Sequence, residues 1–192
     1  MKQTVSLIAA PTSMSPGGYV PVAYAERTTP NVPRAELGVE PSAGGWRIQL
    51  RWACAAPVRS IAGETDRFLD ACALLVPVAA DAPWISMGEP GKPVEGILWK
   101  ADRDRPWRMH AEGLGTMTRA DAPSDWRVGA AWHEGFWEVS FELPEWPLLT
   151  QHRQIAFAIW AGAEQERAGL KSVCPGWLAL ACRRCAGPPY RV

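Results

Sequence analysis

The sequence predicts an all-β protein, an antiparallel β-sandwich with few short helices. Two segments alternate apolar and polar residues with a period of two, the pattern of a strand with one buried face. The chain also has 18 prolines and 17 glycines, most of them between apolar runs, as in short strands joined by turns. Few stretches hold the i, i+3, i+4, i+7 spacing of an amphipathic helix. Many short strands with such turns are typical of a sandwich or barrel.

The predicted strands follow one another along most of the chain. Residues 46–54, WRIQLRWAC, and residues 137–143, WEVSFEL, alternate without a miss. Residues 68–78 and 155–161 are more continuously apolar, as in strands buried on both faces. Shorter strands are expected at 95–100 and 177–182, and one or two helical turns at 105–115. In the first strand one face collects Trp46, Ile48, Leu50, Trp52 and Cys54.

The 192 residues suffice for one substantial core. Residues 1–45 are rich in Pro, Gly, Ser and Thr, and we expect an extended N-terminal arm there, with at most an edge strand. Residues 46–185 are expected to form the β-sandwich domain. Residues 186–192 are expected to be a C-terminal tail.

Composition and motifs argue against several classes of function. The formal net charge is zero. The chain therefore lacks the excess of positive charge expected of a protein that binds nucleic acid or an anionic membrane surface. There is no apolar run long enough for a spanning helix. No phosphate loop or catalytic triad is recognisable. His110, His133 and His152 are isolated, and His133 falls on an expected hairpin tip, so enzyme chemistry has little support.

The cysteines allow two interpretations. Five cysteines cannot all pair within one chain. Cys174, Cys182 and Cys185 form C-x7-C-x2-C, but a structural zinc site needs four ligands. Free thiols are therefore the favoured interpretation, and metal binding is the alternative.

One stretch, WISMGEPGKPVEGILWK at 84–100, places Met87 beside a Gly/Pro-rich turn ahead of a strand. A loop methionine usually fills a gap in a core, but its thioether also suits haem iron or copper. Lys171 would ordinarily be a solvated loop lysine. The 11 tryptophans either fill the core or wall a large flat ligand. The local pattern leaves each of these alternatives open.

Five segments in order resemble a known family. They are DACALLVPV, WISMGEPGKPVEGILWKAD, GLGTMTR, WHEGFWEVSFEL and QIAFAIWAGAEQERAGLKSVCPGW. The resemblance covers about residues 46–180. The chain resembles the haem-b γ subunits of type II dimethyl-sulfoxide-reductase-family molybdoenzymes. Such subunits occur in ethylbenzene dehydrogenase, selenate reductase, chlorate reductase and dimethylsulfide dehydrogenase. The chain departs from that pattern at Pro144, where a basic residue is usual, and at Cys174, where a serine is usual.

The resemblance implies a cofactor and its ligands. It implies one haem b held between the two sheets, with Met87 and Lys171 as axial ligands of the iron and tryptophans against the porphyrin. Lys92 and Lys100 flank the methionine block and are expected to be solvated or, alternatively, to bind the haem propionates. The sequence has no C-x-x-C-H, so covalent haem attachment is not expected.

The resemblance also implies a non-catalytic, electron-transfer subunit. It would dock on an iron–sulfur β subunit next to a molybdopterin α subunit, and exchange electrons with an external cytochrome or quinone-linked carrier. Such subunits are typically periplasmic, but residues 1–29 imitate an export signal only weakly, so the cytoplasmic side is slightly favoured. The alternative is a haem-free β-sandwich that binds carbohydrate or another protein, because tryptophan also stacks on sugars.

Overall fold

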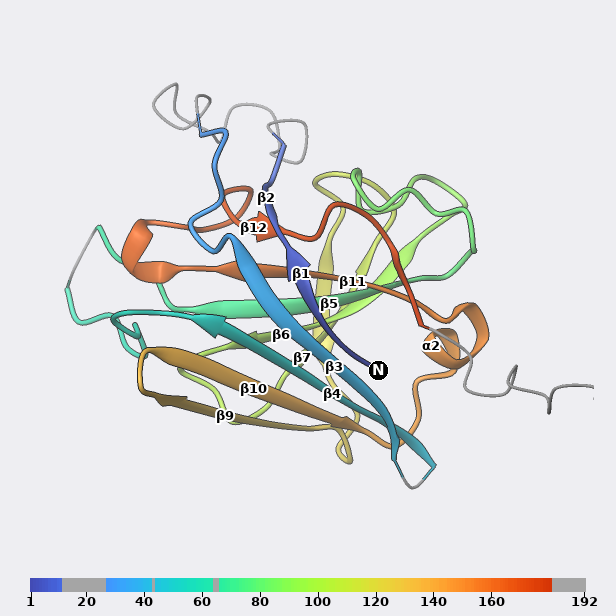
Figure 1. Ribbon diagram of the computed structural model, residues 1–192. Helices are drawn as coiled ribbons and strands as arrows, with labels where there is room; N and C mark the ends of the chain where they lie inside the picture. Colours follow the sequence, from blue (N-terminus) through green and yellow to red (C-terminus); the bar gives the residue numbers. More distant parts are fainter. Residues whose placement is uncertain (12–26, 43, 64–65, 181–192) are drawn as a thin grey trace, which may run out of the picture.

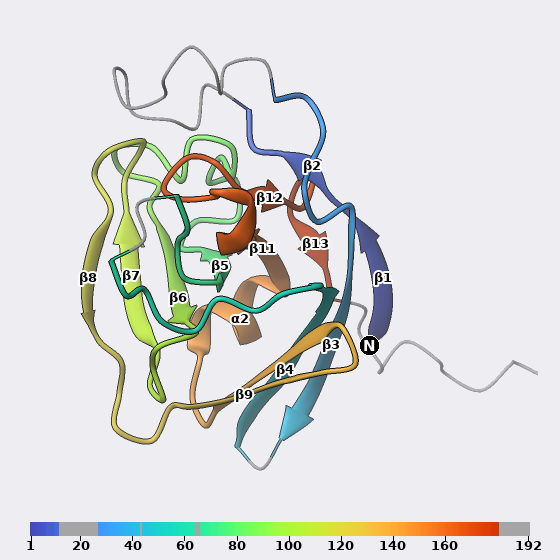
Figure 2. The same ribbon diagram turned by 90° about the vertical axis from the view of Figure 1, so that its left-hand side faces the viewer.

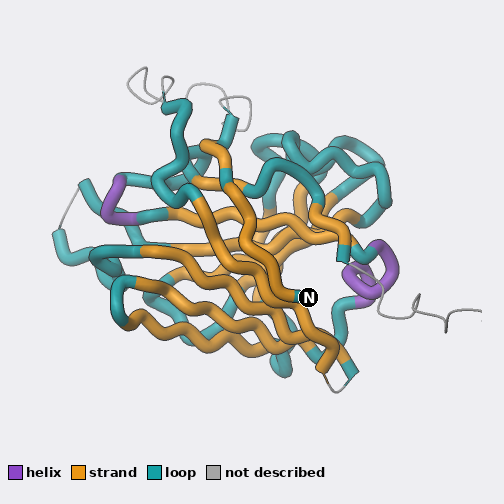
Figure 3. The backbone as a smooth tube through the Cα atoms, viewed as in Figure 1, coloured by secondary structure: helices purple, strands orange, loops and turns teal. Residues whose placement is uncertain are grey.

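The computed structural model describes residues 1–11, 27–42, 44–63 and 66–180. These residues are 47% strand and 6% helix and form two large antiparallel sheets, which confirms the predicted all-β class (Figures 1 and 3). In the described ranges no helix is both long and apolar enough to cross a membrane.

The smaller sheet has five strands in the order β1-β3-β4-β10-β9. Its strands are β1 Lys2–Ser6, β3 Arg34–Ser42, β4 Gly45–Ala53, β9 Arg127–His133 and β10 Phe136–Leu143.

The larger sheet has eight strands in the order β2-β12-β11-β5-β6-β7-β8, with β13 also paired to β11. Its strands are β2 Ile8–Ala9, β5 Ala71–Pro77, β6 Val94–Lys100, β7 Trp107–Ala111, β8 Thr118–Asp121, β11 Gln154–Trp160, β12 Ser172–Val173 and β13 Leu178–Ala179. A short helix, α2 Pro147–His152, precedes β11, and the 3-10 turn η2 Gly162–Glu164 follows it.

The main core lies between the two sheets, which Figure 2 views from the side. The inward face of β4 is buried as its alternation predicts, and Cys54, expected on that face, lies just beyond the end of the strand and is only half-buried. Tryptophans fill much of this core: the Trp137 ring lies 6.4 Å from Trp52 and 5.2 Å from Trp99, centroid to centroid. These rings pack against one another in the sandwich interior, as core aromatic residues do.

The hairpin expected around His133 is confirmed. Strands β9 and β10 pair from His133↔Phe136 onward. The two connecting residues, Glu134 and Gly135, have φ values of 51° and 82°. Positive φ at both positions is the pattern of a type I′ turn, whose twist matches that of the strands it joins.

The helical turns expected at 105–115 are wrong. Residues 107–111 form β7, which pairs with β6 on one side and β8 on the other. The apolar residues of this segment, Trp107, Met109 and Ala111, alternate with polar ones. A segment this short fits both a helical and a strand periodicity, and pairing with β6 makes it a strand.

The N-terminal segment is more integrated than the sequence predicts. Residues 1–45 contribute β1, β2 and β3, and β3 lies inside the five-stranded sheet, paired along β4 from Ala35↔Trp52 to Ser42↔Gly45. Residues 12–26 and 181–192, which include the expected C-terminal tail, lie outside the described residues.

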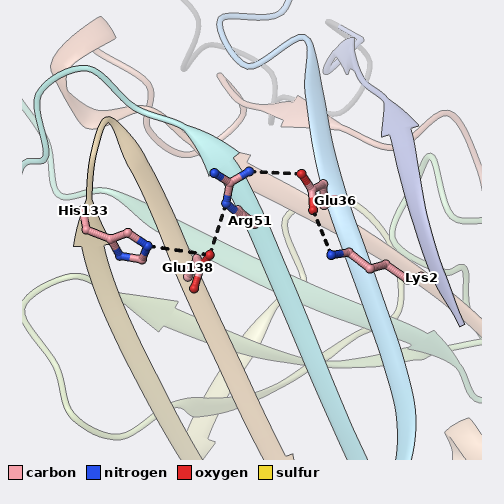
Figure 4. A network of polar contacts seen from close by, with 5 residues as sticks. All are labelled: Lys2, Glu36, Arg51, His133 and Glu138. Carbon is pink, nitrogen blue, oxygen red and sulfur yellow. Dashed lines mark hydrogen bonds and ion pairs between the residues drawn. The ribbon is translucent and has the colours of Figure 1, made fainter.

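The outer face of the five-stranded sheet is polar (Figure 4). Arg51 bridges Glu36 and Glu138, at 3.0 and 3.1 Å, and Lys2 and His133 extend the row at its two ends, at 3.5 and 3.8 Å. All five side chains are at least a third exposed, so each pair contributes little stability. This face is suited to water and not to a large apolar ligand.

Candidate functional site

An apolar cavity of about 370 Å³ lies against the outer face of the eight-stranded sheet. Strand β5 separates it from the core: Ala71, Ala73 and Leu75 line the cavity, whereas the alternate residues of the same strand pack into the core between the sheets. We call it the outer-face cavity. Its volume falls within the ~300–1,000 Å³ of typical small-molecule sites.

In the floor of the outer-face cavity, small alanine side chains of β5 and β11 lie beside the larger Leu75, Leu98 and Met109. On β11, Ala158 pairs with Ala73, and Ala156 pairs with Leu75. Small residues in register across two strands leave room above the sheet for a planar ligand. The walls are larger and mainly apolar, formed by Phe68, Leu69, Trp84, Leu114, Met117 and Trp160.

Met87 and Lys171, the two residues that the family resemblance singles out, both line the outer-face cavity. They come from opposite ends of the sheet. Met87 lies in the loop after β5, Lys171 lies in the loop after β11, and these two strands are antiparallel neighbours. Figure 1 shows η2 and the 78–93 loop at the two ends of these strands. The fold thus brings a thioether and an amine into one apolar space from two directions.

The backbone at Met87 is in an unusual conformation. Its φ is 58° and that of Gly88 is 86°; a bulky side chain rarely adopts a positive φ. The turn is held by hydrogen bonds from Met87 N to Trp84 O, 3.0 Å, and from Gly113 N to Met87 O, 3.1 Å. Gly88 has no room for a side chain, because a Cβ there would lie 2.8 Å from Lys92 O. Strain of this kind is concentrated at functional sites, and here it falls on a residue that lines the outer-face cavity.

Lys171 is a buried lysine with 9% of its surface exposed. Its Nζ donates to Ala168 O at 3.2 Å and lies 5.4 Å from the centre of the Trp160 ring. Desolvation by burial lowers the pKa of Lys171 from its ordinary value to about 8, although the Glu166 charge opposes this shift. A neutral amine has a free lone pair, so above about pH 8 this side chain can act as a metal ligand.

Glu166, which sequence reasoning missed, fixes the loop that carries Lys171. Its carboxylate is buried and accepts hydrogen bonds from Ala161 N, 2.8 Å, and Asn31 Nδ2, 3.0 Å. Burial raises its pKa. Ala10 N donates to Lys171 O at 2.9 Å. Two parts of the N-terminal segment therefore hold the lysine loop in place.

The outer-face cavity also contains residues that the sequence analysis did not select. Met109 on β7 and Met117 in the loop before β8 line it, and so do Arg119 and Arg167. Lys100, which the sequence analysis did name, also lines it. Met109 is buried in the sheet floor. The i, i+2 spacing of Trp107, Met109 and Ala111 is the sequence signal that could have placed Met109 on one face of a strand.

Other candidate residues lie elsewhere. Lys92 is not among the described residues that line the outer-face cavity; it pairs with Asp81 at 2.7 Å and Glu89 at 3.2 Å. The expected alternative of a solvated lysine fits its position.

The three histidines also lie away from the outer-face cavity: His110 and His133 are exposed, and His152 contacts Val78 O at 2.9 Å. Within the described ranges no group of three or more His, Cys, Asp or Glu side chains could hold a metal ion.

The cysteines that the structure describes, Cys54, Cys72 and Cys174, are free thiols. Burial raises the pKa of Cys174, and its Sγ accepts from Phe157 N and donates to Gly176 O, both at 3.2 Å. Cys182 and Cys185 lie outside the described residues, so the metal-binding alternative for the three C-terminal cysteines stays untested.

The tryptophans divide between the two explanations offered by the sequence. Among the described residues only Trp84 and Trp160 line the outer-face cavity. Trp46, Trp52, Trp99, Trp126, Trp137 and Trp146 are buried in the main core. The expectation that tryptophans would surround a flat ligand is therefore wrong for most of them, because the sandwich interior needs large apolar side chains.

The position of the outer-face cavity differs from the expected one. The resemblance placed a haem between the two sheets, where the described core is filled by side chains. The two candidate ligands instead line a cavity on the outer face of the eight-stranded sheet.

The stability of the ligand-free chain should depend on pH through Lys171. Between about pH 8 and 10.5 the unfolded lysine still binds a proton that the folded one has lost, so stability rises with pH across this window, by about 1.4 kcal/mol per pH unit. Below pH 8 Lys171 is protonated in both the folded and the unfolded chain, so the folded chain bears the full free-energy cost of burying the charged lysine. We expect Lys171→Met to be the more stable protein at pH 7, with an advantage that shrinks by about 3 kcal/mol towards pH 10.

Urea unfolding of both proteins at pH 7 and pH 10 checks this prediction. The thiols that titrate in the same range are common to both proteins and cancel in the difference. A difference in unfolding free energy that stays constant with pH would contradict the buried, easily neutralised lysine.

Comparisons with known proteins place the chain in a family. No family model matches it. It is 33% identical over 153 residues, 74% of this chain and 54% of the relative, to a protein of Haloferax mediterranei named as the haem subunit of a respiratory nitrate reductase. It is 31% identical over 151 residues, 68% of this chain and 54% of the relative, to the dimethylsulfide dehydrogenase γ subunit of Rhodovulum sulfidophilum.

A third relative is the chlorate reductase γ subunit of Ideonella dechloratans, 33% identical over 144 residues, 69% of this chain and 58% of the relative. The chain thus spans a little over half the length of the curated relatives it matches. These three matches agree with the family that the sequence resembles, and the chain belongs to the γ-subunit family of these reductases and dehydrogenases.

Proposed function

We propose that this chain is an electron-transfer subunit that binds one haem b in the outer-face cavity, where Met87 and Lys171 would hold the iron. The observation that carries the proposal is that these two residues, far apart in the sequence and singled out by family motifs, line one apolar cavity from opposite ends of the sheet. One relative is named as a haem subunit.

The residues of the outer-face cavity fit such a group. A thioether is a soft ligand suited to haem iron. Lys171 can supply a neutral amine because burial has already lowered its pKa, and the positive charge of a metal favours that form further. The alanine floor accepts a flat ring, and the apolar walls exclude water. The fit rests on donor chemistry and shape together.

Bound haem would supply reversible one-electron chemistry at its iron. The chain's own residues would set the conditions for it. The Met87 thioether would favour the reduced state of the iron and so raise its reduction potential. Lys171 gives up its proton when it binds, so haem affinity should weaken as the pH falls below about 8. The apolar floor and walls keep competing ligands and water from the iron.

The proposed partners follow from the relatives, whose names make them subunits of reductase or dehydrogenase complexes. We propose that this chain docks on an iron–sulfur β subunit, which connects it to a molybdopterin α subunit where the substrate reacts. An external cytochrome or a quinone-linked carrier would exchange electrons with the haem. In this arrangement the chain makes and breaks no substrate bond.

The absorption spectrum of the purified full chain, as isolated and after dithionite, tests the proposal together with a pyridine haemochrome assay. We expect roughly one haem b per chain and a sharp α band on reduction. A colourless protein from haem-replete cells that also refuses added haemin would contradict it. That outcome would favour the haem-free binding module, and Met87 would then be a core anchor.

A further inference from the structure

Two cations of the outer-face cavity lie on β6 and β8, which β11 and β5 separate from β12 and Lys171 in the order of the sheet. Lys100 ends β6 and Arg119 lies on β8, and both line the outer-face cavity. Strand β8 is the edge of the sheet, and all its residues are exposed. Lys171 precedes β12, near the other edge. Positive charge is thus available on the side of the outer-face cavity next to the exposed strand β8.

The two cations are organised around one aromatic ring. The Lys100 Nζ lies 6.0 Å from the centre of the Trp107 ring, and the Arg119 guanidinium carbon lies 5.7 Å from it. Arg103 stacks on the same ring at 3.7 Å. Within the described part of the chain, the contacts recorded for Lys100 and Arg119 are with this ring and not with a carboxylate. Both charges therefore remain available to an anion.

The cations at the opposite side of the outer-face cavity are Lys171, the proposed iron ligand, and Arg167. There Arg167 stacks 4.5 Å over Phe68 and neighbours the buried Glu166 in sequence. The negative charge of Glu166 would repel a carboxylate brought next to it. An anionic group on a ligand in the outer-face cavity is thus favoured at the β6–β8 side and disfavoured at the Lys171 side.

Haem b has its two carboxylates on neighbouring positions of one edge of the ring, and the rest of the ring is apolar. Placing those charges in an apolar cavity without a partner is costly, whereas a charge-assisted hydrogen bond at the rim stabilises them. Resting on the proposed function above, we propose that Lys100 and Arg119 bind the two haem carboxylates and turn that edge of the haem towards the exposed edge of the sheet at β8.

The test uses the full chain loaded with haemin or with haemin dimethyl ester, in which both carboxylates are neutral esters. Transfer of each porphyrin to excess apomyoglobin gives its release rate. We expect wild-type protein to release the ester about tenfold faster than haemin, the effect of losing a charge-assisted contact. The variant Lys100→Gln/Arg119→Gln should release haemin as fast as wild type releases the ester.

The combination of variant and ester decides the matter. If the cations bind the carboxylates, the Lys100→Gln/Arg119→Gln variant should release the dimethyl ester no faster than it releases haemin, and no faster than wild type releases the ester. Fully additive effects, or equal release of haemin and ester by wild type, would overturn the proposal. Lys92→Gln, outside the outer-face cavity, should release haemin like wild type. If wild type takes up neither porphyrin, it is the proposed function that fails.

Discussion

Replacing Met87 by leucine is expected to speed haem release by about 100-fold or more and to change the spectrum of the reduced protein. Leucine keeps an apolar side chain of similar volume, so packing changes little. It removes the sulfur lone pair that would bind the iron. Loss of a group that merely supports a ligand costs about 10–100-fold in metal affinity, and loss of the ligand itself should cost at least the upper end of this range.

The outer-face cavity offers two matched controls, because Met109 and Met117 line it as well. Met109→Leu and Met117→Leu make the same chemical change in the same space. Both should keep the wild-type spectrum and a release rate within a few-fold of it. Met87→Ala should be more severe than Met87→Leu, since it adds an empty volume to the lost ligand.

The measurement combines absorption spectra of oxidised and reduced protein with transfer of haem to apomyoglobin. Lys171→Met, read in the same way, should also lose the native low-spin spectrum. If Met117→Leu changes the spectrum and Met87→Leu does not, the sulfur ligand is Met117. The strained turn at Met87 would then need another explanation. If neither Met87→Leu nor Lys171→Met has an effect, the ligand pair is wrong even in a haem protein.

The second large effect is expected at Asp70: Asp70→Ala should lower the free energy of unfolding by about 4 kcal/mol or more. The Asp70 carboxylate is buried and joins the two sheets. It accepts from Trp137 Nε1 on β10 at 2.9 Å, from Gly162 N after β11 at 2.7 Å and from Val58 N at 2.8 Å. Alanine leaves three donors without an acceptor, at about 1–3 kcal/mol each.

This loss is large against the 5–15 kcal/mol that typically separates folded from unfolded protein. It should also reach the outer-face cavity. Gly162 opens the loop that carries Lys171, and it packs so closely that a Cβ there would lie 1.7 Å from Phe68 O. A loosened Gly162 shifts both the Phe68 wall and the lysine loop. Haem release should therefore accelerate in Asp70→Ala although Asp70 itself does not line the outer-face cavity.

Urea unfolding at constant pH, followed by tryptophan fluorescence and far-UV circular dichroism, checks the prediction. Asp102→Ala is the matched control: Asp102 is exposed, and its loss should change stability by less than about 0.5 kcal/mol. A change of under 1 kcal/mol for Asp70→Ala would mean that water replaces the carboxylate and that the bridge between the sheets is not important.

How much of this protein could be predicted from its sequence depends on how local each feature is. Residues 46–53 and 137–143 alternate because one face of each strand meets a core, so their strands and buried faces followed from the pattern. Ala35, Leu37 and Val39 alternate in the same way and are buried in β3. They were missed because the Gly/Pro-rich surroundings suggested an arm, whereas the free edge of β4 orders the segment as a strand.

The candidate site shows the same division. Motifs alone indicated Met87 and Lys171, and the strained turn at 87–88 is a local property of the chain. The sequence pattern did not show that Met87 and Lys171 line one cavity, nor which other residues line it with them. The continuous apolar run of β5 predicted burial on both faces, but only the tertiary structure decided that loops, and not a second sheet, cover its outer face above a floor of alanines. Periodicity reports which side chains avoid water; what excludes the water is decided by contacts between segments far apart in the chain.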